Sequence, residues 1–234
     1  NGSIDDSVAA IKKTFPDVEV IEAGENLGFT GGNNVGIRKA LEDGADFVWL
    51  LNNDTVVDQH ALIALVDVFG DERVGVAGSK IYFVSGREYH KERYAIKDFG
   101  RVLWYAGGVI DWNNMYAAHR GVDEIDHGQY DEKQETPFVT GCSMMIRKKV
   151  FDEIGLLDER FFAYLEDLDF CLRAKRAGYT LLYAPQSVVW HKNAGSSGGV
   201  GSETHQYYMT RNRLIVGMRY ASLRTKFALF REAL

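Results

Sequence analysis

Two adjacent carboxylic residues, Glu166 and Asp167, are the strongest candidates for acid–base chemistry in this chain. They stand where a helix is expected to begin, and four aromatic residues flank them: Phe161, Phe162, Tyr164 and Phe170. Burial beside aromatic rings raises the pKa of a carboxylate toward the range in which a general base works. First-turn carboxylates are also common partners of the helix dipole, and nearby Asp169 has the i,i+4 spacing of an ordinary surface pair with Arg173. We therefore interpret Asp169 as structural and Glu166–Asp167 as a candidate general base.

A second candidate is the turn Asn52-Asn53-Asp54, which follows an apolar run and carries a single carboxylate. Ligands of α/β folds bind at strand ends. A hard divalent cation prefers oxygen ligands and completes its shell with water or with a diphosphate. The turn therefore predicts a cation site on Asp54. An Asx turn, in which these side chains bond their own backbone, is the alternative.

The segment 25–34 combines three glycines with three asparagines directly before an expected helix. Free backbone N–H groups and the positive end of the helix dipole favour an anion at such a place, for example a diphosphate. A tight turn followed by an N-cap explains the same composition without a ligand.

His191 follows the apolar run Val188–Trp190. A histidine at this position is typical of a hydrogen-bonded strand end, although its imidazole is also a common metal ligand. The two cysteines, Cys142 and Cys171, have neither the number of a disulfide scaffold nor the spacing of a zinc site. We expect both to be reduced thiols in the core.

Short β-branched or aromatic runs alternate with segments of helical period, which predicts one α/β domain over residues 1–234. The expected strands are Val18–Ile21, Phe47–Leu51, Val74–Ala77, Thr180–Tyr183 and Ser187–Trp190. Three helices are expected at Asn33–Leu41, Asp167–Ala177 and Gln206–Tyr220. Asp58 is expected to cap a further helix, whose apolar face consists of Ala61, Leu62, Leu65, Val66 and Phe69. Two segments lack a period and are expected to be loops beside the site, Ser85–Gly100 and Asn193–Ser202.

Composition excludes several classes of protein. Hydrophobic residues make up 46% and charged residues 26% of the 234 residues, which argues against disorder. A net charge of -6 argues against a nucleic-acid partner. No apolar run approaches the ~20 residues that cross a bilayer, and the first residues do not form a signal peptide. Together with the few cysteines, this predicts a cytoplasmic protein.

The order of these motifs resembles a family 2 glycosyltransferase of the GT-A fold, closest to the rhamnosyltransferase-like branch. The motifs that carry the resemblance occupy residues 26–34, 51–55, 140–144 with 151–162, 165–173 and 189–191. The resemblance implies a Rossmann-like, three-layer α/β sandwich with a mixed central sheet. It also implies an N-terminal strand, helix and strand that would precede Asn1, so we expect this chain to lack them.

The resemblance further implies an inverting transfer of a sugar, with rhamnose the best candidate, from a nucleotide-diphosphate donor to a hydroxyl of a glycan or lipid-linked acceptor. Mg²⁺ or Mn²⁺ would assist, held by Asp54, by Asn52 in place of a first aspartate, and by His191. Asp167 would be the base, with Glu166 beside it. The residues implied to bind the donor are Asn26, Gly28, Phe29, Gly31, Gly32, Asn33 and Asn53, and those implied to bind the acceptor are Gly141, Cys142 and Tyr164.

Two other functions compete with this one. A sugar nucleotidyltransferase shares the α/β architecture and the metal, but it would not explain an acidic pair followed by His191. A non-catalytic module that binds sugar nucleotides would explain the glycine-rich segment without the base. The segment Leu223–Phe230 is basic and apolar, which is consistent with peripheral association at the inner face of a membrane.

Overall fold

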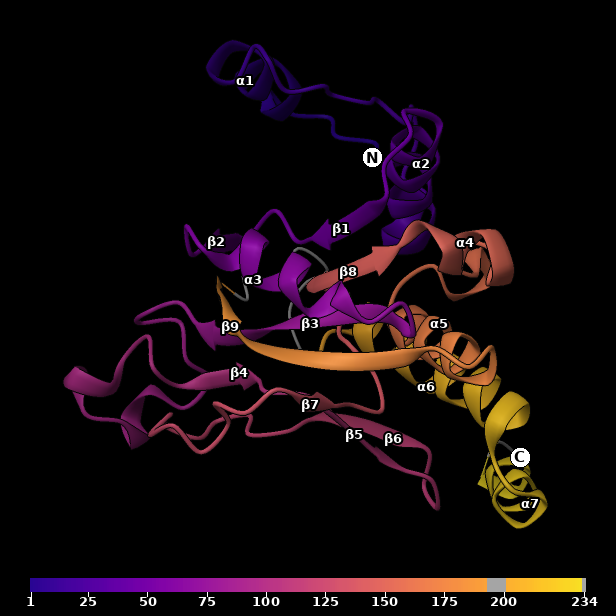
Figure 1. Cartoon of the computed structure of the whole chain (residues 1–234). Coiled ribbons are helices and arrows are strands. Elements are labelled where there is room, and N and C mark those ends of the chain that lie inside the picture. The colour runs from indigo at the N-terminus through magenta and orange to yellow at the C-terminus, as the bar shows by residue number, and fades with distance from the viewer. Residues whose placement is uncertain (193–200, 233–234) are drawn as a thin grey trace.

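A seven-stranded mixed sheet forms the centre of the computed structural model, which describes residues 1–192 and 201–232 (Figure 1). Its main strand order is β1-β8-β3-β9-β2, with β4 beside β3 and β7 beside β9. The strands are β1 (Phe47–Leu51), β2 (Thr55–Val57), β3 (Val74–Phe83), β4 (Leu103–Tyr105), β7 (Gln134–Glu135), β8 (Ser143–Arg147) and β9 (Thr180–His191). The pair β3–β9 is parallel and the other pairs are antiparallel, which confirms the predicted mixed sheet.

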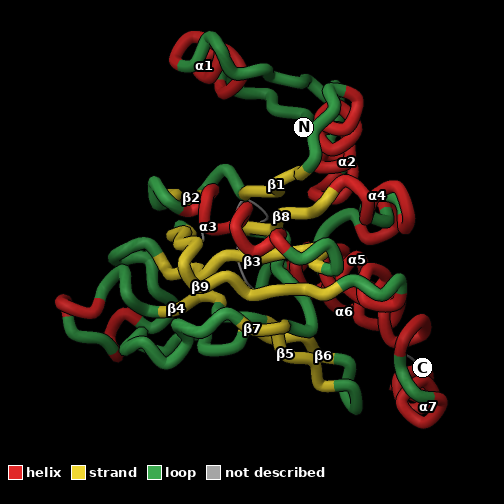
Figure 2. The backbone as a smooth tube through the Cα atoms, viewed as in Figure 1, coloured by secondary structure: helices red, strands yellow, loops and turns green. Residues whose placement is uncertain are grey.

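Helices and a small hairpin surround this sheet (Figure 2). The hairpin consists of β5 (Gly108–Asp111) and β6 (Tyr116–His119). The helices are α1 (Ser7–Thr14), α2 (Gly28–Glu42), α3 (Ala61–Asp67), α4 (Lys148–Ile154), α5 (Glu166–Arg176), α6 (Glu203–Tyr220) and α7 (Leu223–Glu232). Among the described residues, no helix is both long enough and apolar enough to cross a bilayer.

The core divides between the two faces of the sheet. Successive side chains of a strand point to opposite faces. Accordingly, Val76 belongs to one buried cluster and its neighbour Ala77 to the other. Leu65 of α3 packs with Ala77, whereas Ile37 of α2 and Phe170 of α5 pack with Val76. Helices therefore cover both faces, and the predicted three-layer architecture is confirmed.

The strand predicted at Val18–Ile21 is wrong. These residues form no ladder with another strand, and both Val18 and Ile21 are exposed. In the described part of the chain, β1 has β8 as its strand partner and its other edge carries no strand. A β-branched run gains its stability from cross-strand pairs, so without a partner the run stays irregular. The preceding helix α1 projects away from the sheet and buries none of its residues (Figure 1).

Helix α2 begins at Gly28, five positions before the predicted start at Asn33. Gly28 has a φ of +69°, which glycine adopts without steric cost, and its N–H donates to the Asn26 side chain at 3.0 Å. Gly31 then faces Leu27, where a Cβ would stand only 2.7 Å from the Leu27 Cβ. The glycine-rich segment is therefore the first two turns of the helix and does not form a loop before it.

The two runs predicted at Thr180–Tyr183 and Ser187–Trp190 form the single strand β9. Pro185 interrupts the pattern because proline cannot donate to a ladder. The strand absorbs this interruption in a bulge, since Ala184 pairs with Ser79 and Val188 pairs with the next residue, Lys80. Buried hydroxyl groups satisfy one another at the bulge, with Ser79 and Ser187 oxygens 2.8 Å apart.

Most other elements follow the prediction. The Asp58 carboxylate accepts the His60 N–H at 2.8 Å just before α3, but Leu62 and Val66 are exposed, so the apolar face of α3 is narrower than expected. Helices α5 and α6 are confirmed, and Ser85–Gly100 is irregular apart from two short 3-10 turns. Of the predicted loop Asn193–Ser202, residues 193–200 lie outside the described residues.

Candidate active site

Asp54 and His191 lie side by side although they are 137 positions apart in the chain. Strand β2 pairs with β9 so that Thr55 stands opposite His191. This register puts His191 Nε2 3.1 Å from Asp54 Oδ1. Burial lowers the pKa of His191 despite the neighbouring carboxylate, which favours the neutral imidazole that coordinates metals. The structure thus brings together two of the three predicted metal ligands.

The turn that carries Asp54 is hydrogen-bonded to Cys142, the residue directly before β8. The Asn52 N–H donates to the Cys142 carbonyl at 3.0 Å, and the Thr55 hydroxyl donates to the Asn52 carbonyl at 2.6 Å. Asn52 is half-buried and Asn53 is exposed. The Asp54 carbonyl also accepts the Lys192 N–H at 2.8 Å. These bonds do not involve the Asn52 amide or the Asn53 side chain, so the metal role of Asn52 and the donor role of Asn53 stay predictions.

The donor set at Asp54 and His191 fits a divalent ion that is completed by a substrate. No group of three or more histidine, cysteine, aspartate or glutamate side chains suited to a metal occurs among the described residues. Asp54 supplies a carboxylate oxygen and His191 an imidazole nitrogen. A divalent ion held by these two side chains would take its remaining ligands from water and diphosphate oxygens.

The acidic pair Glu166–Asp167 begins α5, and its two carboxylates have unequal surroundings. Asp167 accepts N–H groups from Gly141 at 2.9 Å and from Leu168 at 2.7 Å. Glu166 is only 4% exposed, and its Oε2 has no hydrogen-bond partner. Burial raises the pKa of both groups, and the Asp167 charge raises the pKa of Glu166 further. Donated N–H groups stabilise a carboxylate anion, so within the pair they favour the charge on Asp167 and the proton on Glu166.

The chain reaches this pair through a contorted loop. Phe162, Tyr164 and Leu165 have φ values of +63°, +68° and +65°, in the left-handed region that non-glycine residues rarely adopt. The start of α2 packs against the same loop, because the Thr30 N–H donates to the Phe162 carbonyl at 3.0 Å. A Cβ on Gly28 would stand 2.5 Å from that carbonyl oxygen, so only glycine fits there.

These contacts change the argument for an anion at the start of α2. The N–H groups of Gly28 and Thr30 already donate to oxygens of the protein, and the Gly31 N–H donates to the Leu27 carbonyl. The predicted cradle of free N–H groups is therefore wrong at these positions. Contact of the donor with Asn26, Gly28, Phe29, Gly31, Gly32 and Asn33 stays a prediction that rests on side chains and on shape.

The predicted acceptor residues lie around Asp167. A Cβ on Gly141 would be 3.1 Å from the Phe29 ring and 3.7 Å from the Asp167 Cβ, so α2, Gly141 and the acidic pair converge. Tyr164 is half-buried with its ring against His205 of α6, at a centroid distance of 4.9 Å.

Cys142 does not fit its predicted role as an acceptor contact. Its side chain is 4% exposed, so the thiol offers no surface to an acceptor. Burial raises the pKa of this thiol, and the charges of Asp54 and Asp167 raise it further. Cys142 adjoins both functional groups, because its carbonyl accepts the Asn52 N–H and the N–H of the preceding residue, Gly141, donates to Asp167. It and Cys171 are free, buried thiols as predicted.

Sequence reasoning misjudged Asp169 and missed several residues that hold the site. Asp169 is fully buried, and it accepts hydrogen bonds from Arg173, Arg219 and Tyr220, so its predicted surface pair is an internal anchor between α5 and α6.

Asn212 of α6 was not predicted. Its signal is a polar residue four positions from the buried Val216, on the inner face of a helix.

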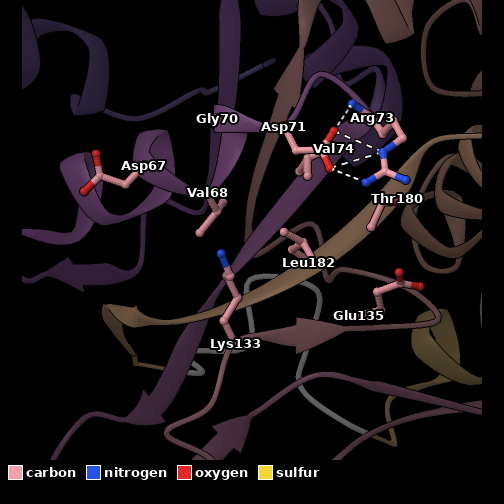
Figure 3. A pocket seen from close by; sticks show the side chains of 10 residues that line it. All are labelled: Asp67, Val68, Gly70, Asp71, Arg73, Val74, Lys133, Glu135, Thr180 and Leu182. Atoms are coloured by element: carbon pink, nitrogen blue, oxygen red, sulfur yellow. Dashed lines mark hydrogen bonds and ion pairs between the residues drawn. The ribbon is translucent and has the colours of Figure 1, made fainter.

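A pocket of about 300 Å³ lies elsewhere, between the end of α3 and strands β3, β7 and β9 (Figure 3). Its lining includes Val74 and Thr180, the first residues of the parallel strands β3 and β9. Ligands of α/β folds bind at the carboxyl ends of parallel strands, where His191 stands. The Arg73 guanidinium at this pocket is paired with Asp71 at 2.7 Å. The pocket is therefore separate from the candidate site.

Two solved structures share the fold. One is GalNAc-T7 with UDP, GalNAc and Mn²⁺, which has a TM-score of 0.64 and 19% sequence identity and covers 91% of this chain and 38% of its own. The other is the mannosyltransferase PcManGT of Pyrobaculum calidifontis with GDP-Man and Mn²⁺, which has a TM-score of 0.56 and 15% sequence identity and covers 99% of this chain and 57% of its own. The fold of this chain is accordingly GT-A.

Curated relatives match at low identity. The Haloferax volcanii protein "Low-salt glycan biosynthesis hexosyltransferase Agl10" is 27% identical over 68% of this chain and 47% of its own length. The Mycobacterium tuberculosis "N-acetylglucosaminyl-diphospho-decaprenol L-rhamnosyltransferase" is 27% identical over 85% of this chain and 66% of its own length. The Shigella flexneri "dTDP-rhamnosyl transferase RfbF" is 25% identical over 92% of this chain and 67% of its own length. The chain thus spans about half to two thirds of these relatives.

The family model described as "Glycosyltransferase like family 2" matches residues 3–213. This range contains the Asn52–Asp54 turn, the acidic pair and His191. The chain therefore belongs to the family 2 glycosyltransferases.

Proposed function

We propose that this protein is an inverting glycosyltransferase that uses a nucleotide-diphosphate sugar as donor. The observation that carries the proposal is that the neighbouring residues Gly141 and Cys142 join two unlike groups. The Cys142 carbonyl accepts the N–H of Asn52, in the turn whose Asp54 carboxylate pairs with His191 and suits a cation. The Gly141 N–H donates to the partly buried carboxylate of Asp167.

The reaction needs these two groups and no enzyme nucleophile. The acceptor hydroxyl attacks the anomeric carbon from the face opposite the diphosphate, and the bond from carbon to diphosphate oxygen breaks as the new bond forms. Asp167 takes the hydroxyl proton. Asp54 and His191 would hold a divalent ion, which would supply positive charge to offset that of the departing diphosphate. Glu166 stays protonated beside Asp167, and this keeps a second negative charge away from the base.

Rhamnose is the sugar that we propose for the donor. Two of the relatives are named as rhamnosyltransferases, and one of these names specifies dTDP-rhamnose. The relative from M. tuberculosis is named for a decaprenol-linked acceptor, and we accordingly propose a glycan or lipid-linked hydroxyl as acceptor.

Helix α7 supports the membrane association that such an acceptor requires. Leu223, Phe227 and Phe230 are 85%, 66% and 58% exposed, and their i, i+4, i+7 spacing puts them in one stripe. The opposite side of the helix is buried through Leu229, which packs against Gly217 of α6. Exposed Arg224 and Arg231 follow these apolar residues in the chain and lie at one border of the stripe. A helix that packs against the protein on one side and exposes an apolar stripe with cationic side chains at its border suits the surface of an anionic bilayer.

The test of the function is a panel of donors, dTDP-rhamnose first, with UDP-glucose and GDP-mannose for comparison. We expect release of nucleoside diphosphate with an acceptor present and inversion at the anomeric carbon by NMR. Release of pyrophosphate would indicate a nucleotidyltransferase instead. Donor binding without any transfer would indicate a binding module.

Asp167→Asn preserves shape but cannot take the hydroxyl proton. We expect a loss of kcat of ~10²-fold or more, with donor affinity little changed, because the base acts only in the transition state. Glu166→Gln is the matched control, since glutamine resembles a protonated glutamate. Near-normal transfer by Asp167→Asn together with an inactive Glu166→Gln would reverse the assignment of the pair.

The raised pKa of Glu166 predicts how stability varies with pH. Folding favours the protonated form, so the folded state binds more protons than the unfolded state and stability falls as pH rises above the ordinary glutamate pKa. Glu166→Gln removes this loss. Calorimetric unfolding over a pH series should show the variant gaining on the wild type from acidic to neutral pH. A constant difference would mean that folding leaves the pKa of Glu166 unchanged.

Asp54→Ala should abolish the dependence of donor affinity on Mn²⁺, because the Asn52–Asp54 turn then has no carboxylate for the cation. Calorimetric titration of dTDP-rhamnose with Mn²⁺ and with a chelator measures this dependence. Asp58→Ala removes a carboxylate four positions further on, where it accepts the His60 N–H, and should leave the Mn²⁺ effect intact. An unchanged Mn²⁺ effect in Asp54→Ala would remove this residue from the metal site.

The α7 stripe should bind vesicles that contain phosphatidylglycerol and not vesicles of phosphatidylcholine alone. Replacing Phe227 and Phe230 by serine removes apolar surface worth about 1.5–3 kcal/mol per ring, so co-flotation should weaken at least about tenfold. Ile63→Ser on α3 is the control, because Ile63 is similarly exposed at 57%. Equal flotation of the double variant and the control would disprove the membrane surface.

A further inference from the structure

The loop Phe161–Leu165 has to be held in place because it is unfavourable by itself. Three of its residues, Phe162, Tyr164 and Leu165, adopt left-handed backbone conformations. Residues with a Cβ keep such conformations only where the surroundings impose them. Leu165 is also the residue from which α5 starts, so its backbone angles set the direction in which Glu166 and Asp167 leave the loop.

One side chain, Asn212 of α6, contacts most of this loop. Its Nδ2 lies within hydrogen-bond distance of three carbonyls, those of Phe161 at 3.0 Å, Ala163 at 2.7 Å and Tyr164 at 2.7 Å, which share its two hydrogens. Asn212 is fully buried, so water does not compete for these carbonyls. The left-handed residues turn the carbonyls inward, toward a single amide group.

Arg211 holds the adjoining part of the chain and orients the amide. Its guanidinium donates to the carbonyls of Arg160 and Phe161 and, through Nε, to Asn212 Oδ1 at 2.9 Å. The oxygen of the Asn212 amide is thereby occupied, which leaves the nitrogen to face the loop. Tyr208 of the same helix stacks on Phe162 with ring centroids 5.0 Å apart.

We propose that Asn212 is a positioning residue for Asp167, acting through the left-handed loop that orients the first turn of α5. The proposal rests on the proposed function, in which Asp167 is the base. The residue types closest to asparagine in shape do not fit these contacts. Aspartate would point a negative charge at three carbonyls, and leucine would leave them buried without a donor.

The contact that reports the position of Asp167 is its hydrogen bond from the Gly141 N–H. The amide proton of Gly141 can be followed by NMR in protein labelled with ¹⁵N-glycine, and a Gly141→Ala sample identifies the signal. An amide that donates to a carboxylate resonates downfield, so loss of the bond moves the signal. This measurement needs no substrate.

Asn212→Ala should shift the Gly141 signal and lower kcat at least tenfold, with donor affinity within about twofold of wild type. Thr225→Ala is the control. Thr225 is also a buried polar residue, with its hydroxyl oxygen 3.0 Å from that of Ser222 at the start of α7, and it is not part of the candidate site. We expect the control to lose thermal stability while it keeps the Gly141 signal and kcat.

Asn212→Ser retains one short donor and serves if the alanine variant does not fold. It should give a smaller change of the same kind. A Gly141 signal and kcat that stay at wild-type values in a folded Asn212 variant would overturn the proposal. If the wild type transfers no sugar but Asn212→Ala still moves the Gly141 signal, the proposed function fails while the positioning of Asp167 by Asn212 stands.

Discussion

The parallel pairing of β3 with β9 is the constraint on which the rest of the site depends. Parallel strands require a long crossover, and here the crossover includes β8 and α5, which bring Gly141 and the acidic pair to the sheet. Both strands end at the same edge, where Phe83 pairs with His191. Strand β2 adds to β9 at that edge and carries Asp54 with it. One pairing thus gathers residues from three distant parts of the chain.

Burial then gives chemically similar groups different states. Glu166 and Asp167 are neighbours in sequence, but Asp167 accepts the N–H groups of Gly141 and Leu168 with both oxygens, whereas the Glu166 Oε2 has no hydrogen-bond partner. Burial likewise raises the pKa of the Cys142 thiol, which the charges of Asp54 and Asp167 raise further. Burial also lowers the pKa of the His191 imidazole, although Asp54 lies beside it. Hydrogen bonds therefore favour the charged form of one group, Asp167, while burial favours the neutral forms of the groups near it. This pattern is common in sites that move protons.

Much of this arrangement could be predicted from the sequence. Strand β1 and helices α5 and α6 follow from periodicity, and the meeting of Asp54 with His191 follows from the family resemblance. The strand at Val18–Ile21 could not be excluded, because pairing depends on a neighbour that the local pattern does not reveal. The start of α2 was misplaced since glycine is a poor helix former, and only the close approach to Phe162 explains glycine at position 28. Asn212 escaped notice because its three partners are backbone carbonyls, which leave no trace in residue types.

The left-handed loop has a consequence for how this protein can change over time. Each left-handed residue with a Cβ costs about 1–3 kcal/mol, so the loop draws on the modest net stability of the fold. Glycine at position 162, 164 or 165 would relieve this cost and also loosen the first turn of α5. Selection for heat resistance alone would therefore favour replacements that blunt the chemistry. In the proposed mechanism, the loop is the place where the stability of the fold and the orientation of Asp167 oppose each other.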